Sequence, residues 1–170
     1  MSDIGRALLD RELDHHVWAT NRLLRACDDL ETAQFEQVFP IGLGSLGATL
    51  RHVIGSTDRW ADRLHPETPD PSPHVSADTR TVAELYGAMA RADEKLRTAI
   101  DRILELDALE VPMDFTLAAG GVVSFSYGAG VIHVLSHGVH HRAQCLWVLR
   151  QLGEALPELD AIEAELAKGE

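Results

Sequence analysis

Residues 132–144 read IHVLSHGVHHRAQ, and this stretch holds four of the nine histidines in the chain. The longer run from about Tyr127 to Leu152 places apolar residues at the spacing of a helix with one buried face. Gly153 follows at the position where glycine commonly ends a helix. We therefore expect one long helix over residues 127–152, with the rest of the fold organised around its histidine-rich middle.

The spacing of the histidines on this helix indicates a metal site. His137 and His141 are four residues apart, so their rings lie one above the other on one face. His133 lies one turn earlier on nearly the same face, whereas His140 points away from it. Two imidazoles at this spacing can bind one ion, so His133/His137 and His137/His141 are both candidate pairs. The alternative is a helix whose histidines form hydrogen bonds in the core or face water.

Length and charge limit the classes of function. The chain has 170 residues, and we expect a single domain over residues 1–170. Hydrophobic residues make up 45% and charged residues 25%, as in ordinary globular proteins. The formal net charge is −12 and no basic run occurs, which argues against nucleic acid and anionic membranes as partners.

The cysteines and the apolar runs bear on the compartment. Cys27 and Cys145 are the only two cysteines and form no CxxC motif, so we expect no disulfide framework. The sequence has no run of 18 apolar residues and no signal-peptide pattern at its start. We therefore expect a cytoplasmic protein with no membrane partner.

Three further amphipathic helices are expected from periodicity and capping residues. Ser45 is a favourable N-cap for the second of them, and Thr81 with Glu84 forms a capping box at the start of the third. We expect these helices over about residues 3–30, 46–64 and 82–106. The third would bury one apolar stripe, formed by Leu85, Met89, Ala92, Leu96, Ala99 and Ile103.

Residues 109–125 differ in character from the helices. Apolar residues alternate along part of this segment, and Gly120 and Gly121 interrupt it. The pattern is typical of a short β-hairpin that turns at the two glycines, although a plain loop fits it as well. A hairpin here would lie directly before the last long helix.

Two peripheral segments complete the expected organisation. Pro157 is expected to start a short acidic C-terminal helix. The proline-rich stretch 65–78 is expected to be a surface loop that exposes His65 and His74.

The remaining candidate residues are His52, His15 and His16. His15 and His16 point about 100° apart on one helix, so both cannot face one site, and we expect each at the surface or beside the site. His52 has small residues around it, which would leave a hollow at the imidazole or would let two helices pack closely. These small neighbours are Ser45, Ala48, Thr49, Gly55 and Ser56.

Together these patterns predict an all-α protein, a four-helix bundle with a short C-terminal helix. Bundles place metal sites between facing helices, and His52, His137 and His141 would supply three neutral nitrogen ligands. Three protein ligands with one free position are typical of catalytic zinc sites, whereas structural sites usually have four. Nitrogen ligation suits Zn²⁺, Ni²⁺, Cu²⁺ or Fe²⁺ and does not choose among them.

The sequence also resembles a known family. Residues 45–54 (SLGATLRHVI), residues 137–144 (HGVHHRAQ) and residues 18–24 (WATNRLL) are similar to the DinB/YfiT-like family of small helical metalloproteins. The resemblance extends over about residues 8–153. It implies a four-helix bundle, often dimeric, that holds a divalent metal ion through three residues.

Transferred by motif, those three residues are His52, His137 and His141, which excludes His133. One difference from the family is Ala143, where glycine is frequent.

The resemblance further implies a class of chemistry. Relatives with known activities are transferases or isomerases that use mycothiol, bacillithiol or glutathione. We therefore expect a thiol-dependent S-transferase that acts on small electrophiles, with a low-molecular-weight thiol as cosubstrate. The alternatives are a metal-dependent hydrolase and a non-catalytic metal-binding module of a stress response. Cys145, four residues after His141, would favour the non-catalytic module if it were a fourth ligand.

A homodimer is expected for two reasons, the resemblance and the supply of apolar residues. The bundle helices carry more large apolar residues than one core stripe requires. The candidates for a dimer face are Trp18, Trp60, Trp147, Leu146 and Leu149, although the tryptophans could equally lie in the core.

Overall fold

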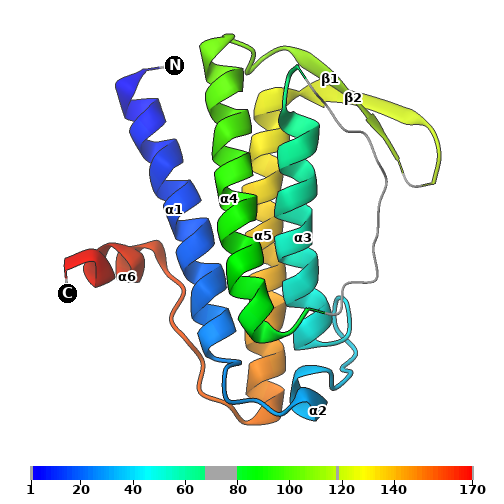
Figure 1. Cartoon of the computed structure of the whole chain (residues 1–170), viewed down its shortest axis with the longest axis vertical. Helices are drawn as coiled ribbons and strands as arrows, with labels where there is room; N and C mark the ends of the chain where they lie inside the picture. The colour runs from blue at the N-terminus through cyan, green and yellow to red at the C-terminus, as the bar shows by residue number, and fades with distance from the viewer. Residues whose placement is uncertain (1, 68–79, 118, 170) are drawn as a thin grey trace.

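Four long helices make up the body of the protein in the computed structural model, which describes residues 2–67, 80–117 and 119–169 (Figure 1). α1 and α3 each pack against both α4 and α5. α3 and α4 run in one direction and α1 and α5 in the other (Figure 1). The four helices are α1 (Asp3–Arg25), α3 (Leu46–Leu64), α4 (Val82–Glu105) and α5 (Tyr127–Leu152).

The helix ends follow from side chains that the sequence places there. The hydroxyls of Ser45 and Ser126 each accept a hydrogen bond from the backbone N–H three residues later. Thr81 and Glu84 form the complete capping box at the start of α4. Gly153 ends α5 with φ of 79°, a left-handed conformation that glycine adopts without strain.

Two expected helix boundaries are wrong. α1 ends at Arg25 instead of about Leu30, and the acidic pair at 28–29 would be unfavourable at the negative end of a helix. A short helix, α2 (Thr32–Phe35), follows in the connection. The C-terminal helix α6 (Ala161–Leu166) begins four residues after Pro157.

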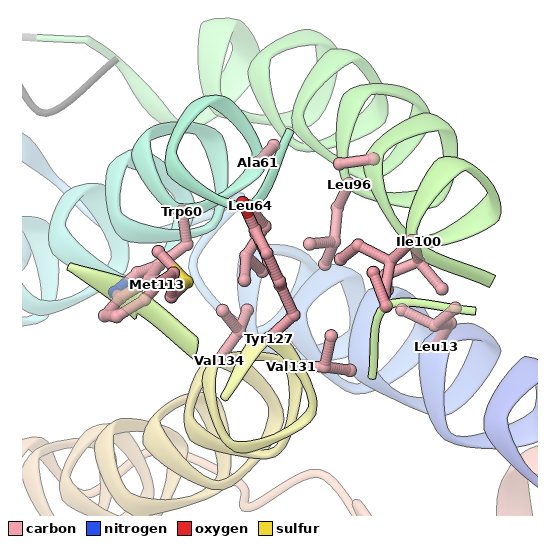
Figure 2. Packing of buried hydrophobic residues seen from close by; sticks show 13 residues of the cluster. Leu13, Trp60, Ala61, Leu64, Leu96, Ile100, Met113, Tyr127, Val131 and Val134 are labelled. Atoms are coloured by element: carbon pink, nitrogen blue, oxygen red, sulfur yellow. The ribbon is translucent and has the colours of Figure 1, made fainter. Parts of the chain in front are cut away.

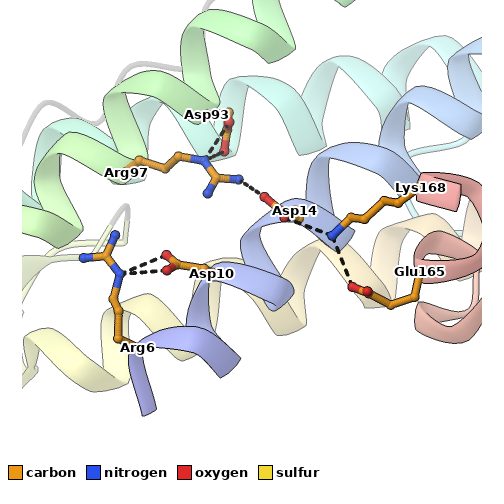
Figure 3. A network of polar contacts seen from close by, with 7 residues as sticks. All are labelled: Arg6, Asp10, Asp14, Asp93, Arg97, Glu165 and Lys168. Atoms are coloured by element: carbon orange, nitrogen blue, oxygen red, sulfur yellow. Dashed lines mark hydrogen bonds and ion pairs between the residues drawn. The ribbon is translucent and has the colours of Figure 1, made fainter. Parts of the chain in front are cut away.

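The late start of α6 has a tertiary cause. The ring of His15 on α1 forms a 2.6 Å hydrogen bond with the carbonyl of Leu159, which ties the segment before α6 to α1. Lys168 then pairs with Asp14 at 3.2 Å and Asp14 with Arg97 of α4 at 3.0 Å (Figure 3). Such exposed pairs contribute little stability individually, and here they tie the C-terminal segment to the bundle.

The core consists of two clusters along the bundle axis. One lies toward the hairpin end and includes Trp60, Leu64 and Ile100 (Figure 2). The other includes Leu50, Met89 and both free cysteines. Every residue of the stripe expected on α4 is buried, which confirms the helical phase.

The segment before α5 is a β-hairpin, so the hairpin interpretation is confirmed. β1 (Pro112–Thr116) and β2 (Val122–Ser126) are antiparallel, with Met113 opposite Phe125 and Phe115 opposite Val123. Directly opposed residues point to the same face, as do alternate residues along one strand. The hairpin therefore has one apolar face, which it turns toward the bundle.

Much of the expected loop 65–78 lies outside the described residues, as does His74. His65 is half-buried, so its expected exposure is only partial. In the described part of the chain, no helix combines the length and the hydropathy that a membrane span requires.

Candidate metal centre

Three histidine rings converge between α3 and α5. His52 comes from α3, and His137 and His141 come from successive turns of α5. Nε2 of His137 lies 3.0 Å from Nε2 of His52 and 3.1 Å from Nε2 of His141. Among the described residues, this is the one group of three or more His, Cys, Asp or Glu side chains with ligand atoms within 4.8 Å of one another.

These distances fit a shared cation. Two nitrogens that bind one tetrahedral ion at about 2.0–2.1 Å are roughly 3.3 Å apart. Three unprotonated nitrogens would otherwise direct their lone pairs at each other, which is unfavourable unless a proton or a cation lies between them. The three residues therefore fit a divalent ion held by imidazoles alone.

The histidines are neutral at neutral pH, as ligation requires. Burial, together with the neighbouring His141 and Arg59, lowers the pKa of His52 to about 4. Burial and the surrounding histidines lower the pKa of His137 to about 3. Burial also lowers the pKa of His141. Protons therefore compete weakly with a metal ion at this cluster.

Gln144 fixes the orientation of His141. Nδ1 of His141 donates a 2.8 Å hydrogen bond to Oε1 of Gln144, which leaves Nε2 unprotonated and directed at the cluster. The amide nitrogen of Gln144 donates in turn to Nε2 of His140 at 3.0 Å. A Cβ at Gly42 would collide with this amide, so the loop before α3 uses glycine to admit it. Sequence reasoning missed this role, although Gln144 lies three residues after His141.

His133, the other candidate on α5, lies outside the cluster. Its ring is 5.5 Å from the ring of His137 and 4.8 Å from that of Trp60. The structure thus brings His52 to the His137/His141 pair and leaves His133 against an aromatic wall.

Cys145 does not approach the cluster as a ligand. Its side chain is fully buried in the second core cluster, and burial raises the pKa of the thiol well above its ordinary value. The group of ligand atoms contains no cysteine. Cys145 therefore acts as a small apolar core residue.

Of the two positions expected for His16, at the surface or beside the site, the structure excludes the surface. Its side chain is 2% exposed, and its Nδ1 accepts a 3.0 Å hydrogen bond from the guanidinium of Arg142. Its Nε2 then donates to the hydroxyl of Thr57 at 3.1 Å. A Cβ at Gly138 would collide with the ring, so this glycine lets α1 approach α5. The one sequence feature that indicated this close approach of α1 and α5 was Gly138, a glycine inside a long helix.

The small residues around His52 serve packing. Ser45, Thr49 and Ser56 are buried, as expected for closely packed helices. A hollow of about 470 Å³ lies farther along α3 and α5, beneath the hairpin, and His133 and Trp60 line it.

Chemically, the cluster can bind a divalent ion through three nitrogens. Among the described residues, no fourth protein ligand belongs to the group. Such a site has room for an exchangeable ligand.

Comparisons with known proteins agree with this architecture. The model of the DinB family matches residues 1–169. The protein named DinB from Bacillus subtilis (strain 168) is 25% identical over 167 residues, which cover 94% of this chain and 92% of that protein. The crystal structure of a DinB-like protein, YjoA, from Bacillus subtilis matches with a TM-score of 0.62 and 16% identity, over 91% of this chain and 98% of that one. At 16% identity, the structural match shows the fold alone.

Proposed function

The chain belongs to the DinB family, and from that premise we propose that it is a divalent-metal-dependent S-transferase. Family membership and the three-histidine cluster fit a metal-binding DinB-like protein. The transferase activity, the metal ligation by His52, His137 and His141, and a low-molecular-weight thiol as cosubstrate are our proposals. The observation that supports them best is the convergence of three neutral imidazoles with no fourth protein ligand among the described residues.

The residues would have different roles at such a site. His52 and His137 would hold the ion from two helices, and Gln144 orients His141 as the third ligand. A divalent ion held there would lower the pKa of a coordinated thiol, so that thiolate forms at neutral pH. In the transfer, a bond forms between the thiol sulfur and an electrophilic carbon, the bond from that carbon to its leaving group breaks, and the thiol proton passes to solvent.

Spectroscopy of the Co²⁺-loaded protein tests the exchangeable position. A small thiol added to the loaded protein should produce an intense sulfur-to-cobalt charge-transfer band, which the His52→Ala variant should lack. Cys145→Ser serves as the control and should behave as the wild type. A band that is present before thiol is added, and lost in Cys145→Ser, would overturn the proposal. Turnover is then assayed with a panel of low-molecular-weight thiols and small electrophiles.

The outcome also separates the alternatives. A charge-transfer band without turnover of any thiol and electrophile in the panel would favour a non-catalytic metal-binding module. Turnover of esters or amides in the absence of thiol would favour a metal-dependent hydrolase.

We also propose a homodimer, but its interface differs from the expected one. Trp60 and Leu149 are buried within the protomer, so they are not available to a partner. Ile132 and Val139 on α5 remain exposed, at 69% and 53%. A stable dimer would have a Kd of about one micromolar or lower. Sedimentation that shows only monomer at a protein concentration about ten times that Kd would therefore exclude it.

A further inference from the structure

The hollow beneath the hairpin is a pocket with a well-packed aromatic wall. Its wall is formed by the apolar face of the hairpin, with Phe115 and Phe125, and by Trp60 of α3. The rings of Trp60 and Phe115 stack with centroids 5.4 Å apart and planes 3° from parallel. The guanidinium of Arg63 lies 4.9 Å from the Phe115 ring and 5.6 Å from the Trp60 ring, which braces the wall.

The hairpin creates the hollow because its apolar face extends beyond the core. Met113 is buried at the base and joins the core cluster together with Trp60 (Figure 2). Nearer the turn, Phe115 is only partly buried, and Leu117 and Val123 are each 40% exposed. Apolar side chains at the tip therefore overhang a space that the protein does not fill.

The pocket adjoins the histidine cluster. His133 lines it and lies one helical turn from His137, with ring centroids 5.5 Å apart. Trp60 lies two turns after His52 on α3, so both helices connect the pocket to the cluster. A ligand with one end at the cluster needs to pass only the ring of His133 to reach the aromatic wall.

The chemistry of the lining selects the ligand. Every lining residue except His133 is apolar, and the lining contains no Asp, Glu, Lys or Arg side chain. The volume of about 470 Å³ falls within the range of small-molecule sites, roughly 300–1,000 Å³. A neutral aromatic or aliphatic group fits such a site, because no lining residue is a Lys or Arg that would pair with an anionic group.

We propose that this pocket is a substrate subsite, which holds the uncharged aromatic or aliphatic part of the electrophile while its reacting carbon lies at the metal centre. This inference rests on the proposed function. It narrows the substrate class from small electrophiles in general to electrophiles with an apolar group of about one or two rings.

The first measurement addresses the pocket alone, in metal-free protein. The neutral dye N-phenyl-1-naphthylamine should bind with enhanced fluorescence. Ala129→Trp, which fills the pocket from α5, should weaken this binding at least about tenfold, because the apolar burial is lost. The matched control is Ala83→Trp, at an exposed position in the first turn of α4, and it should bind as the wild type.

The second measurement addresses the link to the metal centre. With Co²⁺-loaded protein, 1-benzylimidazole should bind at least about tenfold more tightly than 1-methylimidazole, because only its phenyl ring reaches the pocket. The preference should disappear in Ala129→Trp and persist in Ala83→Trp. Val123→Lys, which places a charge in the pocket, provides a second variant should Ala129→Trp fail to fold.

The outcomes separate the two proposals. If 1-methylimidazole binds the Co²⁺ protein and 1-benzylimidazole binds no better, the subsite is wrong and the proposed function stands. If the dye does not bind, the subsite is also wrong. If neither imidazole alters the Co²⁺ spectrum, the open metal position is wrong, and the proposed function and the subsite fall together.

Discussion

α5 contributes to two side-chain clusters that differ in how the histidine nitrogens are used. The converging cluster consists of His52, His137 and His141, and the closed cluster consists of His16, Arg142 and Thr57. Around His16, both ring nitrogens have protein partners, Arg142 and Thr57, and the side chain is almost completely buried. Around His137, the Nε2 atom faces only the Nε2 atoms of two other half-buried histidines. Burial lowers the pKa of His16 and of His137 alike to about 3. A low pKa therefore does not distinguish a candidate metal ligand from a structural histidine, whereas the partners of the two ring nitrogens do.

Substitutions in the two clusters should accordingly change different properties of the protein. Loss of a residue from the converging cluster should abolish metal binding. Loss of a residue from the closed cluster should reduce the free energy of unfolding and leave metal stoichiometry unchanged.

The largest expected effect is on metal binding. Replacing His52, His137 or His141 with alanine should abolish stoichiometric metal binding, because two remaining imidazoles cannot hold the ion tightly. His133→Ala is the matched control on the same helix and should retain full occupancy. Elemental analysis of protein purified without a histidine tag measures this, and full occupancy in His52→Ala would exclude the three-histidine site.

The next effect is the pH dependence of stability in metal-free protein. Burial holds the pKa of His16 near 3, below its unfolded value of about 6.5, so the unfolded state binds more protons between these values. The stability that neutral His16 contributes is therefore complete above about pH 6.5 and is lost as pH falls toward 3, by a few kcal/mol in all. His52 and His137 act in the same direction, with smaller effects because they are half-exposed.

Urea unfolding between about pH 6.5 and 5 separates the effect of the buried histidines from that of the carboxylates, since carboxylates with ordinary pKa values titrate lower. The free energy of unfolding should fall steadily over that interval. An unchanged value would contradict a buried, neutral His16.

Replacement of His16 in the closed cluster should lower the free energy of unfolding by a comparable or smaller amount. His16→Ala leaves a cavity and removes the shorter of two hydrogen bonds that buried Arg142 donates, and it should cost about 2–4 kcal/mol of unfolding free energy. Metal stoichiometry at saturating metal should remain that of the wild type. If His16→Ala instead lost its metal without a change in stability, the distinction between the clusters would be wrong.

The smallest expected effect concerns the hydrogen bond between Gln144 and His141. Gln144→Ala removes the acceptor that orients His141 and should weaken metal affinity by about 10–100-fold with full occupancy at saturation. Competition with a chromophoric chelator measures the change. Gln144→Glu keeps the acceptor oxygen and should retain most of the affinity, whereas equal losses in both variants would argue against an orienting hydrogen bond.

Local patterns predicted much of this protein. The family resemblance is confirmed, as are the four-helix bundle, the caps at Ser45 and Thr81 and the β-hairpin before α5. The convergence of His137 and His141 follows from a four-residue spacing that any helix imposes. Each of these features depends on residues close in sequence.

What the sequence did not reveal depends on contacts between distant segments. His16 and Arg142 are 126 positions apart, and only the close approach of α1 to α5 at Gly138 buries them together. The start of α6 likewise depends on the contact between His15 and Leu159, 144 positions apart. Gln144 lies beside the proposed ligands in sequence, but its fixed orientation depends on Gly42 in another loop.

The sequence separation of 85 positions from His52 to His137 has a consequence for folding. An ion bound to both would join the two ends of a loop that contains α4 and the hairpin, as a reversible cross-link. Its ligands converge only in the folded chain, so the ion would stabilise that state by mass action, by about 2.7 kcal/mol at a free concentration 100 times its Kd. The thermal midpoint of this protein would then report the free metal concentration around it.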